Sequence, residues 1–123
     1  MRAKKRILIV EDDEMVITLL KILLEKEGFQ LVVARDGNKG AEAVQNIKPD
    51  LILMDIMLPY KSGMEVISIA KKKYKEIPII VLSALGQVEQ TIDEAMRIGV
   101  ADVIAKPFVV DKLLSRIRTL LKK

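Results

Sequence analysis

The run Leu51-Ile52-Leu53-Met54 is apolar throughout and is followed directly by Asp55. It shows no alternation of polar and apolar residues, which is typical of a parallel β-strand covered on both faces. Four further apolar runs of strand length occur, at residues 7–10, 31–34, 79–82 and 103–105. Segments with helical periodicity follow each run, at residues of about 14–27, 38–47, 64–74, 87–98 and 110–122.

The five repeats of strand and helix predict an α/β fold. Five βα units with right-handed crossovers favour an open, doubly wound parallel sheet over a closed barrel, which needs eight such units. We expect the flavodoxin-like strand order 2-1-3-4-5, which places a ligand crevice at the carboxyl ends of strands 1 and 3. Pro49 and Pro78 precede strands, and Gly28 and Gly99 stand at expected helix ends. No linker interrupts the pattern, so residues 1–123 are predicted to form a single domain.

The composition excludes several kinds of chemistry. The 123 residues include no Cys and no His, so thiolate or imidazole metal sites, disulfides and a Ser-His-Asp triad are absent. The net charge of +4 is interpreted as solvated helix faces, and the scarcity of aromatic residues argues against direct nucleic-acid binding. The basic N-terminus leads into only four apolar residues before acidic ones, which fits neither a secretory nor a membrane segment. We therefore expect a cytoplasmic location and no membrane partner.

Acidic residues follow the two strands that should border the crevice. Glu11, Asp12 and Asp13 follow the first strand, and Asp55 follows the third. Clustered carboxylates raise one another's pKa unless a cation offsets their charge, and Mg²⁺ prefers such oxygen ligands. Asp13 is better placed to cap the helix that begins near Glu14, so we assign it to that role and not to the site.

The two remaining strands near the crevice deliver a hydroxyl and an ammonium group. Ser83 ends the fourth strand, and Lys106 follows the fifth. The hydroxyl can donate to a phosphoryl oxygen, and the lysine can neutralise charge as a compact cation. Either residue alone would be interpreted as an ordinary turn residue, but together with the carboxylates they predict a phosphate and metal site with a carboxylate nucleophile.

The chain resembles the response-regulator receiver domains of two-component signalling systems from about residue 5 to its C-terminus. The resemblance rests on four segments in a fixed order: Ile7-Leu8-Ile9-Val10-Glu11-Asp12-Asp13, Leu51-Ile52-Leu53-Met54-Asp55-Ile56-Met57-Leu58-Pro59 with Gly63 beyond it, Ser83-Ala84, and Lys106-Pro107-Phe108.

This resemblance implies a role for each site residue. Glu11 and Asp12 would be the acidic pair, with Asp12 the more direct metal ligand. Asp55 would be the phosphoacceptor and a metal ligand, and the backbone carbonyl of Met57 would complete the protein's share of the coordination. The ion would be Mg²⁺, with Mn²⁺ as an alternative.

Two further residues would act on the phosphoryl group. Ser83 would hydrogen-bond to it and move with it. Lys106 would pair with Asp55 or with its phosphoryl group, after a Lys106–Pro107 bond that is cis in the family.

The resemblance also implies a function as a signalling switch. Asp55 would accept a phosphoryl group from a sensor histidine kinase or a histidine phosphotransfer protein, and water would later hydrolyse the acyl phosphate. The domain would assist its own phosphorylation and dephosphorylation without being an enzyme. Its output would be a downstream protein bound at the face of the fourth helix, fifth strand and fifth helix, in a monomer or a phosphorylation-dependent dimer.

The sequence departs from the family pattern at several positions. Val103 stands where many receivers carry a switch aromatic, so we expect any switch to run through backbone and packing. Met57 and Leu85 occupy positions that govern dephosphorylation, and neither can orient water, which predicts a long-lived phosphorylated state. At the dimerisation face known in the family, Asp102 and Arg116 match residues that form ion pairs, whereas Lys112 replaces an acidic residue.

Three alternatives stay open at the level of sequence. The chain could be the receiver of a longer regulator, for example a DNA-binding one. A hydrolase with an aspartyl-phosphate intermediate would usually carry a second acid at the position of Met57. A flavin carrier would need a phosphate-cradling loop after the first strand and a stacking aromatic residue. The cognate kinase, the output target, the oligomeric state and the lifetime of the phosphorylated form are not determined by these residues.

Overall fold

A computed structural model describes residues 4–58, 60–84 and 89–121. Five strands form one parallel sheet in the order β2-β1-β3-β4-β5, which confirms the expected topology. The strands are β1 (Arg6–Val10), β2 (Gln30–Ala34), β3 (Leu51–Asp55), β4 (Ile79–Ser83) and β5 (Asp102–Ala105).

Each strand is followed by a helix. The helices are α1 (Glu14–Lys26), α2 (Gly37–Asn46), α3 (Gly63–Lys73), α4 (Glu89–Ile98) and α5 (Val110–Leu121). Their bounds agree with the periodic segments to within two residues, although the expected first residues of the fourth helix and residue 122 lie outside the described residues. Within the described ranges, no helix is long and apolar enough to cross a membrane.

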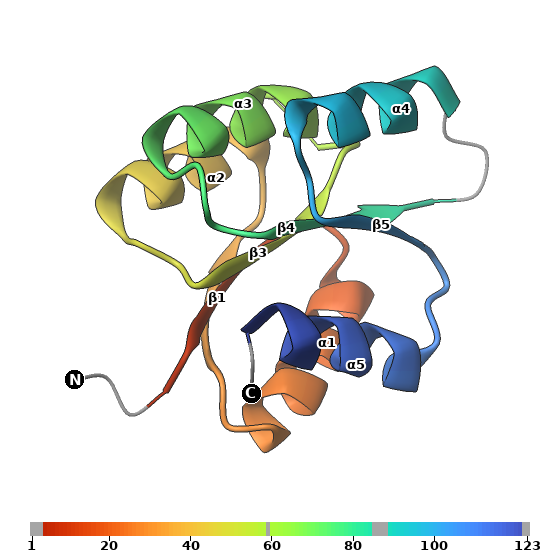
Figure 1. Ribbon diagram of the computed structural model, residues 1–123. Coiled ribbons are helices and arrows are strands. Elements are labelled where there is room, and N and C mark those ends of the chain that lie inside the picture. The colour runs from red at the N-terminus through yellow and green to blue at the C-terminus, as the bar shows by residue number, and fades with distance from the viewer. Residues whose placement is uncertain (1–3, 59, 85–88, 122–123) are drawn as a thin grey trace.

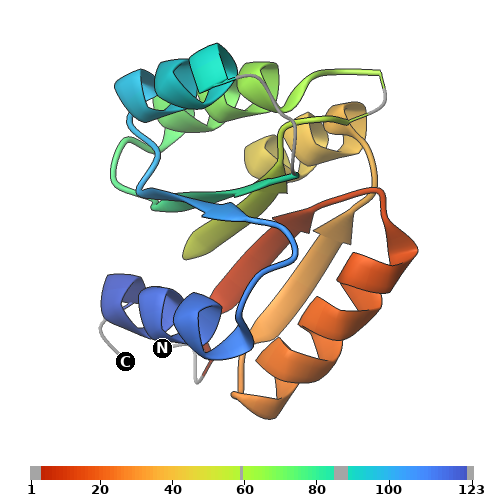
Figure 2. The ribbon, with the colours of Figure 1, turned by 90° about the vertical axis from the view of Figure 1, so that its right-hand side faces the viewer.

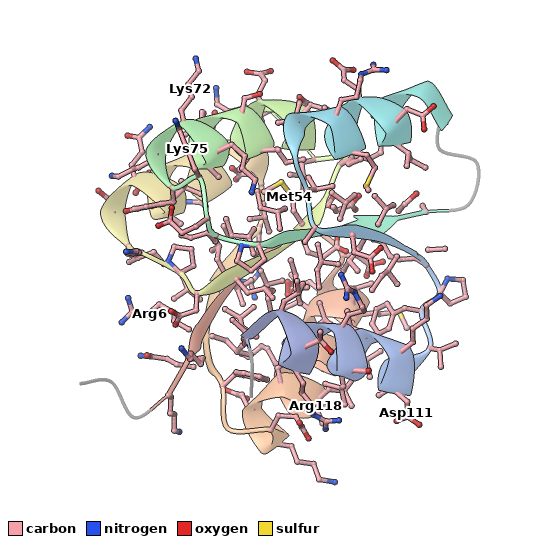
Figure 3. The ribbon with its side chains drawn as sticks, in the orientation of Figure 1. Arg6, Met54, Lys72, Lys75, Asp111 and Arg118 are labelled. Carbon is pink, nitrogen blue, oxygen red and sulfur yellow. The ribbon has the colours of Figure 1, made fainter. Side chains whose placement is uncertain are left out.

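The sheet lies between two helical layers (Figures 1 and 2). Helices α2, α3 and α4 cover one face, and α1 and α5 cover the other. Successive side chains of a strand point to opposite faces, so Leu8 and Met54 pack under the first layer and Ile7 and Leu53 under the second. Figure 3 shows Met54 between the sheet and α3. Burial on both faces explains why the strands are apolar without alternation.

Local interactions begin and end the helices at the positions that the sequence indicates. The Asp13 side chain accepts a hydrogen bond of 2.9 Å from the backbone N–H of Met15, so its predicted role as the N-cap of α1 is confirmed. Gly28 and Gly99 have φ angles of 91° and 110°, a region in which residues other than glycine are disfavoured.

The register of the sheet brings the functional strand ends together. Val10 pairs with Met54, so the acidic residues after β1 lie beside Asp55 at the end of β3. Asp55 pairs with Leu82, and Ser83 pairs with Ala105. Residues from four strands therefore meet at one rim.

Candidate functional site

Three carboxylates converge at the carboxyl ends of β1 and β3. One carboxylate oxygen from each of Glu11, Asp12 and Asp55 lies within 4.8 Å of the other two. Glu11 and Asp55 are 0% and 6% exposed, whereas Asp12 is exposed. The set consists only of oxygen donors, and a hard divalent cation that retains several waters fits such a set.

Lys106 lies between two of these carboxylates. Its Nζ donates to Glu11 Oε1 at 2.7 Å and to Asp55 Oδ2 at 3.1 Å. The predicted pairing of Lys106 with Asp55 is therefore confirmed, and the expected cis bond between Lys106 and Pro107 is present. The shorter bond to Glu11 was not predicted, because no local signal links residues that are 95 positions apart in the chain.

Backbone groups hold the remaining carboxylate oxygens. Glu11 Oε2 accepts from the N–H groups of Asp12 and Asp13 at 3.0 and 3.4 Å. Asp55 Oδ1 accepts from the N–H of Met57 at 3.0 Å. Glu11 and Asp55 thus each have both carboxylate oxygens engaged within the protein, and the exposed Asp12 is the carboxylate most accessible to an ion.

Burial and mutual repulsion shift the ionisation of this cluster. Burial raises the pKa of Glu11 to about 7, and the Asp55 charge adds to the rise while the hydrogen bond from Lys106 opposes it. Burial by itself would lower the pKa of Lys106, but its hydrogen bond to Glu11 and the charge of Asp55 outweigh that effect and raise it. The site therefore carries excess negative charge that a cation would relieve.

Ser83 and Met57 complete the rim in different ways. Ser83 is 5% exposed at the end of β4, and its hydroxyl donates to the carbonyl of Ala84 at the long distance of 3.5 Å. Such a weak bond leaves the hydroxyl available for a better acceptor. Met57 is 68% exposed, and because its thioether is a soft donor, a hard cation would contact this residue through its backbone carbonyl. Leu85, the other position expected to govern dephosphorylation, lies outside the described residues.

The face formed by β5 and α5 carries an ion pair within the chain. Arg116 Nε donates to Asp102 Oδ2 at 2.9 Å, so these two residues satisfy each other in the monomer. Val103, at the position where the family resemblance leads one to expect an aromatic residue, is partly buried and packs against the core under α4.

Comparison with known proteins identifies the class to which this fold and site belong. Residues 7–118 match the family model described as the response regulator receiver domain. A DNA-binding dual master transcriptional regulator, RpaA of Synechocystis, is 38% identical over 120 residues, which are 96% of this chain and 49% of that protein. The chain thus spans about half the length of that curated relative.

Solved receiver domains have the same architecture. The receiver domain of Francisella response regulator 1452 is 32% identical, with a TM-score of 0.86 over 97% of this chain and 98% of that one. A response regulator receiver domain protein from Methanospirillum hungatei is 30% identical, with a TM-score of 0.90 over 98% of this chain and 95% of that one.

This chain belongs to the response regulator receiver family of two-component systems. Receivers of this family are phosphoacceptor switches and not classical enzymes, and they work with histidine kinases and output domains.

Proposed function

We propose that Asp55 of this chain is the phosphoacceptor and that phosphorylation depends on Mg²⁺. The ion would be held by Asp12, by the carboxylate of Asp55 and by the backbone carbonyl of Met57, with Glu11 as the supporting acid and Mn²⁺ as an alternative ion. The observation that carries this proposal is the convergence of the Glu11, Asp12 and Asp55 carboxylates within 4.8 Å of one another. Asp55 is buried in this cluster, and Lys106 contacts it directly.

The transfer can be described through the residues of this chain. A carboxylate oxygen of Asp55 forms a bond to phosphorus as the bond from phosphorus to the donor's histidine nitrogen breaks. Lys106, 3.1 Å from Asp55 Oδ2, is placed to pair with the phosphoryl oxygens, and the weakly bonded Ser83 hydroxyl can donate to one of them. When bound, Mg²⁺ supplies further positive charge to those oxygens.

The lifetime of the acyl phosphate follows from the residues near the attacking water. Met57 offers no acid or amide to orient that water, so we expect slow decay. The measurement is the rate at which the phosphorylated protein loses its adduct mass, in the wild type and in Met57→Gln. Fast decay of the wild type that Met57→Gln does not accelerate would contradict the expectation.

The phosphodonor approaches past an apolar part of α1. Met15 and Ile22 are 82% and 62% exposed on this helix, and with Leu19 they border a shallow hollow beside Glu14 and Thr18. A second hollow, next to Leu19, reaches Lys106 and Phe108. Exposed apolar patches of this kind mark interaction surfaces. Because they flank the site, we assign them to the kinase or phosphotransfer protein.

This assignment separates donor docking from chemistry. Ile22→Glu is expected to slow transfer from a cognate kinase while phosphorylation by acetyl phosphate stays unchanged, since the small donor needs no docking surface. An equal loss with both donors would contradict it. Gln45→Glu, at an exposed position of α2 on the other side of the sheet, adds the same single negative charge and is the matched control.

The remaining parts of the proposal concern the whole chain. We propose that residues 1–123 act as one cytoplasmic receiver domain without direct nucleic-acid binding. Its output would be a protein target at the face of α4, β5 and α5, as a monomer or a phosphorylation-dependent dimer. Since the chain spans half of RpaA, an attached output domain is the open alternative.

The experiment that tests the proposal is intact mass after incubation with acetyl phosphate, with and without Mg²⁺, on the wild type and Asp55→Asn. A single Mg²⁺-dependent phosphoryl adduct that is absent from Asp55→Asn supports the proposed acceptor. Failure of a folded, metal-binding wild type to form the adduct would overturn it.

A further inference from the structure

The loop that follows the phosphoacceptor combines anchored and exposed side chains. Of its described residues, 56–58 and 60–62, Ile56 is buried and Leu58 packs against the core, whereas Met57 and Tyr60 are 68% and 86% exposed. Tyr60 also has a φ of 70°, a left-handed conformation that costs a tyrosine energy. Such strain persists only where further contacts hold the backbone in place.

One such contact lies at the end of the loop. The N–H of Gly63 donates to the carbonyl of Ile56 at 2.9 Å and closes the loop at its base. A Cβ at Gly63 would lie 2.6 Å from both the Asp55 carbonyl oxygen and the Ile56 Cα. The base of the loop is thus pressed directly against the end of β3.

The second contact comes from α2, the helix that precedes β3 in the chain. A Cβ at Gly37, the first residue of α2, would overlap the carbonyl oxygen of Lys61 and would lie 2.5 Å from its carbonyl carbon. It would also lie 2.7 Å from the Lys61 Cβ. Gly37 is therefore needed for space, because the helix lies directly on the loop backbone.

Helix α2 is itself fixed to the strand that supplies the other acids. Gly40, one turn further on, lies against Val10, where an added Cβ would be 2.8 Å from a side-chain carbon. Val10 immediately precedes Glu11. Asp36 is the N-cap of α2, and its side chain accepts a hydrogen bond of 2.8 Å from the N–H of Lys39. Close packing contacts thus connect the end of β1, helix α2 and the loop.

We propose that Gly37 is a positioning residue for the metal site, an inference that rests on the proposed function. The ligands proposed for the ion come from two segments, with Asp12 after β1 and the Met57 carbonyl in the loop. Through Gly40 and Gly37, α2 sets the distance between these segments. Gly37 touches neither the ion nor the phosphoryl group and acts only through the Lys61 backbone.

Gly37→Ala tests this role with a readout that needs no phosphorylation. We expect Mn²⁺ affinity, measured from the free-ion signal in electron paramagnetic resonance, to fall by about 10- to 100-fold, as is typical when support for a metal ligand is lost. Asn38→Ala is the control, because it changes the next, exposed residue of the same helix and leaves the contact between Gly37 and Lys61 unchanged. It is expected to retain wild-type affinity even if it lowers the free energy of unfolding.

A second pair of variants keeps the test decisive if Gly37→Ala does not fold. Lys61→Gly loosens the loop backbone at the contact without a steric clash, whereas Lys61→Ala removes the same side chain and keeps the backbone stiff. Both lose the ion pair to Glu65. We expect a loss of Mn²⁺ affinity in Lys61→Gly relative to Lys61→Ala.

The outcomes are distinguishable. If the wild type binds Mn²⁺ and Gly37→Ala, or Lys61→Gly where that variant replaces it, binds as tightly as its control, the positioning role is overturned while the proposed function stands. If the wild type binds no Mn²⁺, the proposed function itself fails and the inference fails with it.

Discussion

Replacing Lys106 by methionine removes the cation between Glu11 and Asp55 while keeping a flexible chain of similar size. Lys106 Nζ lies 2.7 Å from Glu11 Oε1 and 3.1 Å from Asp55 Oδ2. The two carboxylate side chains are 1% and 9% exposed, so neither can regain full hydration. Removing one partner of a buried pair typically costs about 3–5 kcal/mol of unfolding free energy because the other charge stays buried.

Protonation of Glu11 limits the loss of unfolding free energy in Lys106→Met, so the loss depends on pH. The pKa of Glu11 in the folded protein is about 7, above its ordinary value of 4.5. A group with a raised folded pKa contributes stability below its unfolded pKa and loses it as pH rises through the folded pKa. The pKa of Lys106 is raised from 10.5, so its own contribution is constant at neutral pH and below. Without Lys106, the pKa of Glu11 rises further.

We therefore expect Lys106→Met to lose about 3 kcal/mol near pH 8.5, where both carboxylates lose the cation, and a smaller amount, about 1–2 kcal/mol, near pH 5.5, where Glu11 is neutral and Asp55 alone loses its ion pair. Urea unfolding followed by circular dichroism, in EDTA at both pH values, measures the two losses. Mg²⁺ should restore part of the loss at the higher pH, because a second cation then offsets the carboxylates.

Two controls connect the effect to its cause. Glu11→Gln in the Lys106→Met background should remove the pH-dependent part of the loss, since the coupled carboxyl is gone. Lys112→Met replaces an exposed lysine of α5 and should change stability little. Equal losses at both pH values, or a pH dependence that survives Glu11→Gln, would refute the reasoning.

Three further predictions concern local structure and packing. Tyr60→Asn should raise the unfolding free energy by about 1 kcal/mol, because asparagine tolerates a φ of 70° and an 86% exposed ring loses no packing; a lowered urea midpoint would contradict this. Asp13→Ala should cost about 1 kcal/mol of thermal stability by removing the cap bond to the Met15 N–H, whereas Asp13→Asn should keep most of it. Leu20→Ala, at a residue 0% exposed under the sheet, should cost about 2–5 kcal/mol in urea unfolding, and a cost below 1 kcal/mol would show that the core collapses to fill the space.

The fold class, and the strand ends that meet at the site, were predictable from the amino-acid sequence. Five apolar runs with intervening helical periodicity predicted the strands and helices, because parallel strands covered on both faces must be apolar and helices must bury one stripe. The rule that ligands bind at the carboxyl ends of such strands then brought Glu11, Asp55 and Lys106 to one rim. The cap formed by Asp13 was predictable as well, since capping is a local interaction.

The contacts of these groups with one another and with the rest of the chain became apparent from the packed structure alone. Lys106 contacts Glu11 more closely than Asp55, although the two contacting residues are separated by 95 positions. The Arg116 side chain pairs with Asp102 of its own chain, where a sequence allows either an internal or an intermolecular partner. Gly37 lies on the Lys61 backbone, a contact that no pattern in the sequence indicates. Periodicity records whether a residue is buried, but which atoms meet depends on the packing of whole helices against the sheet.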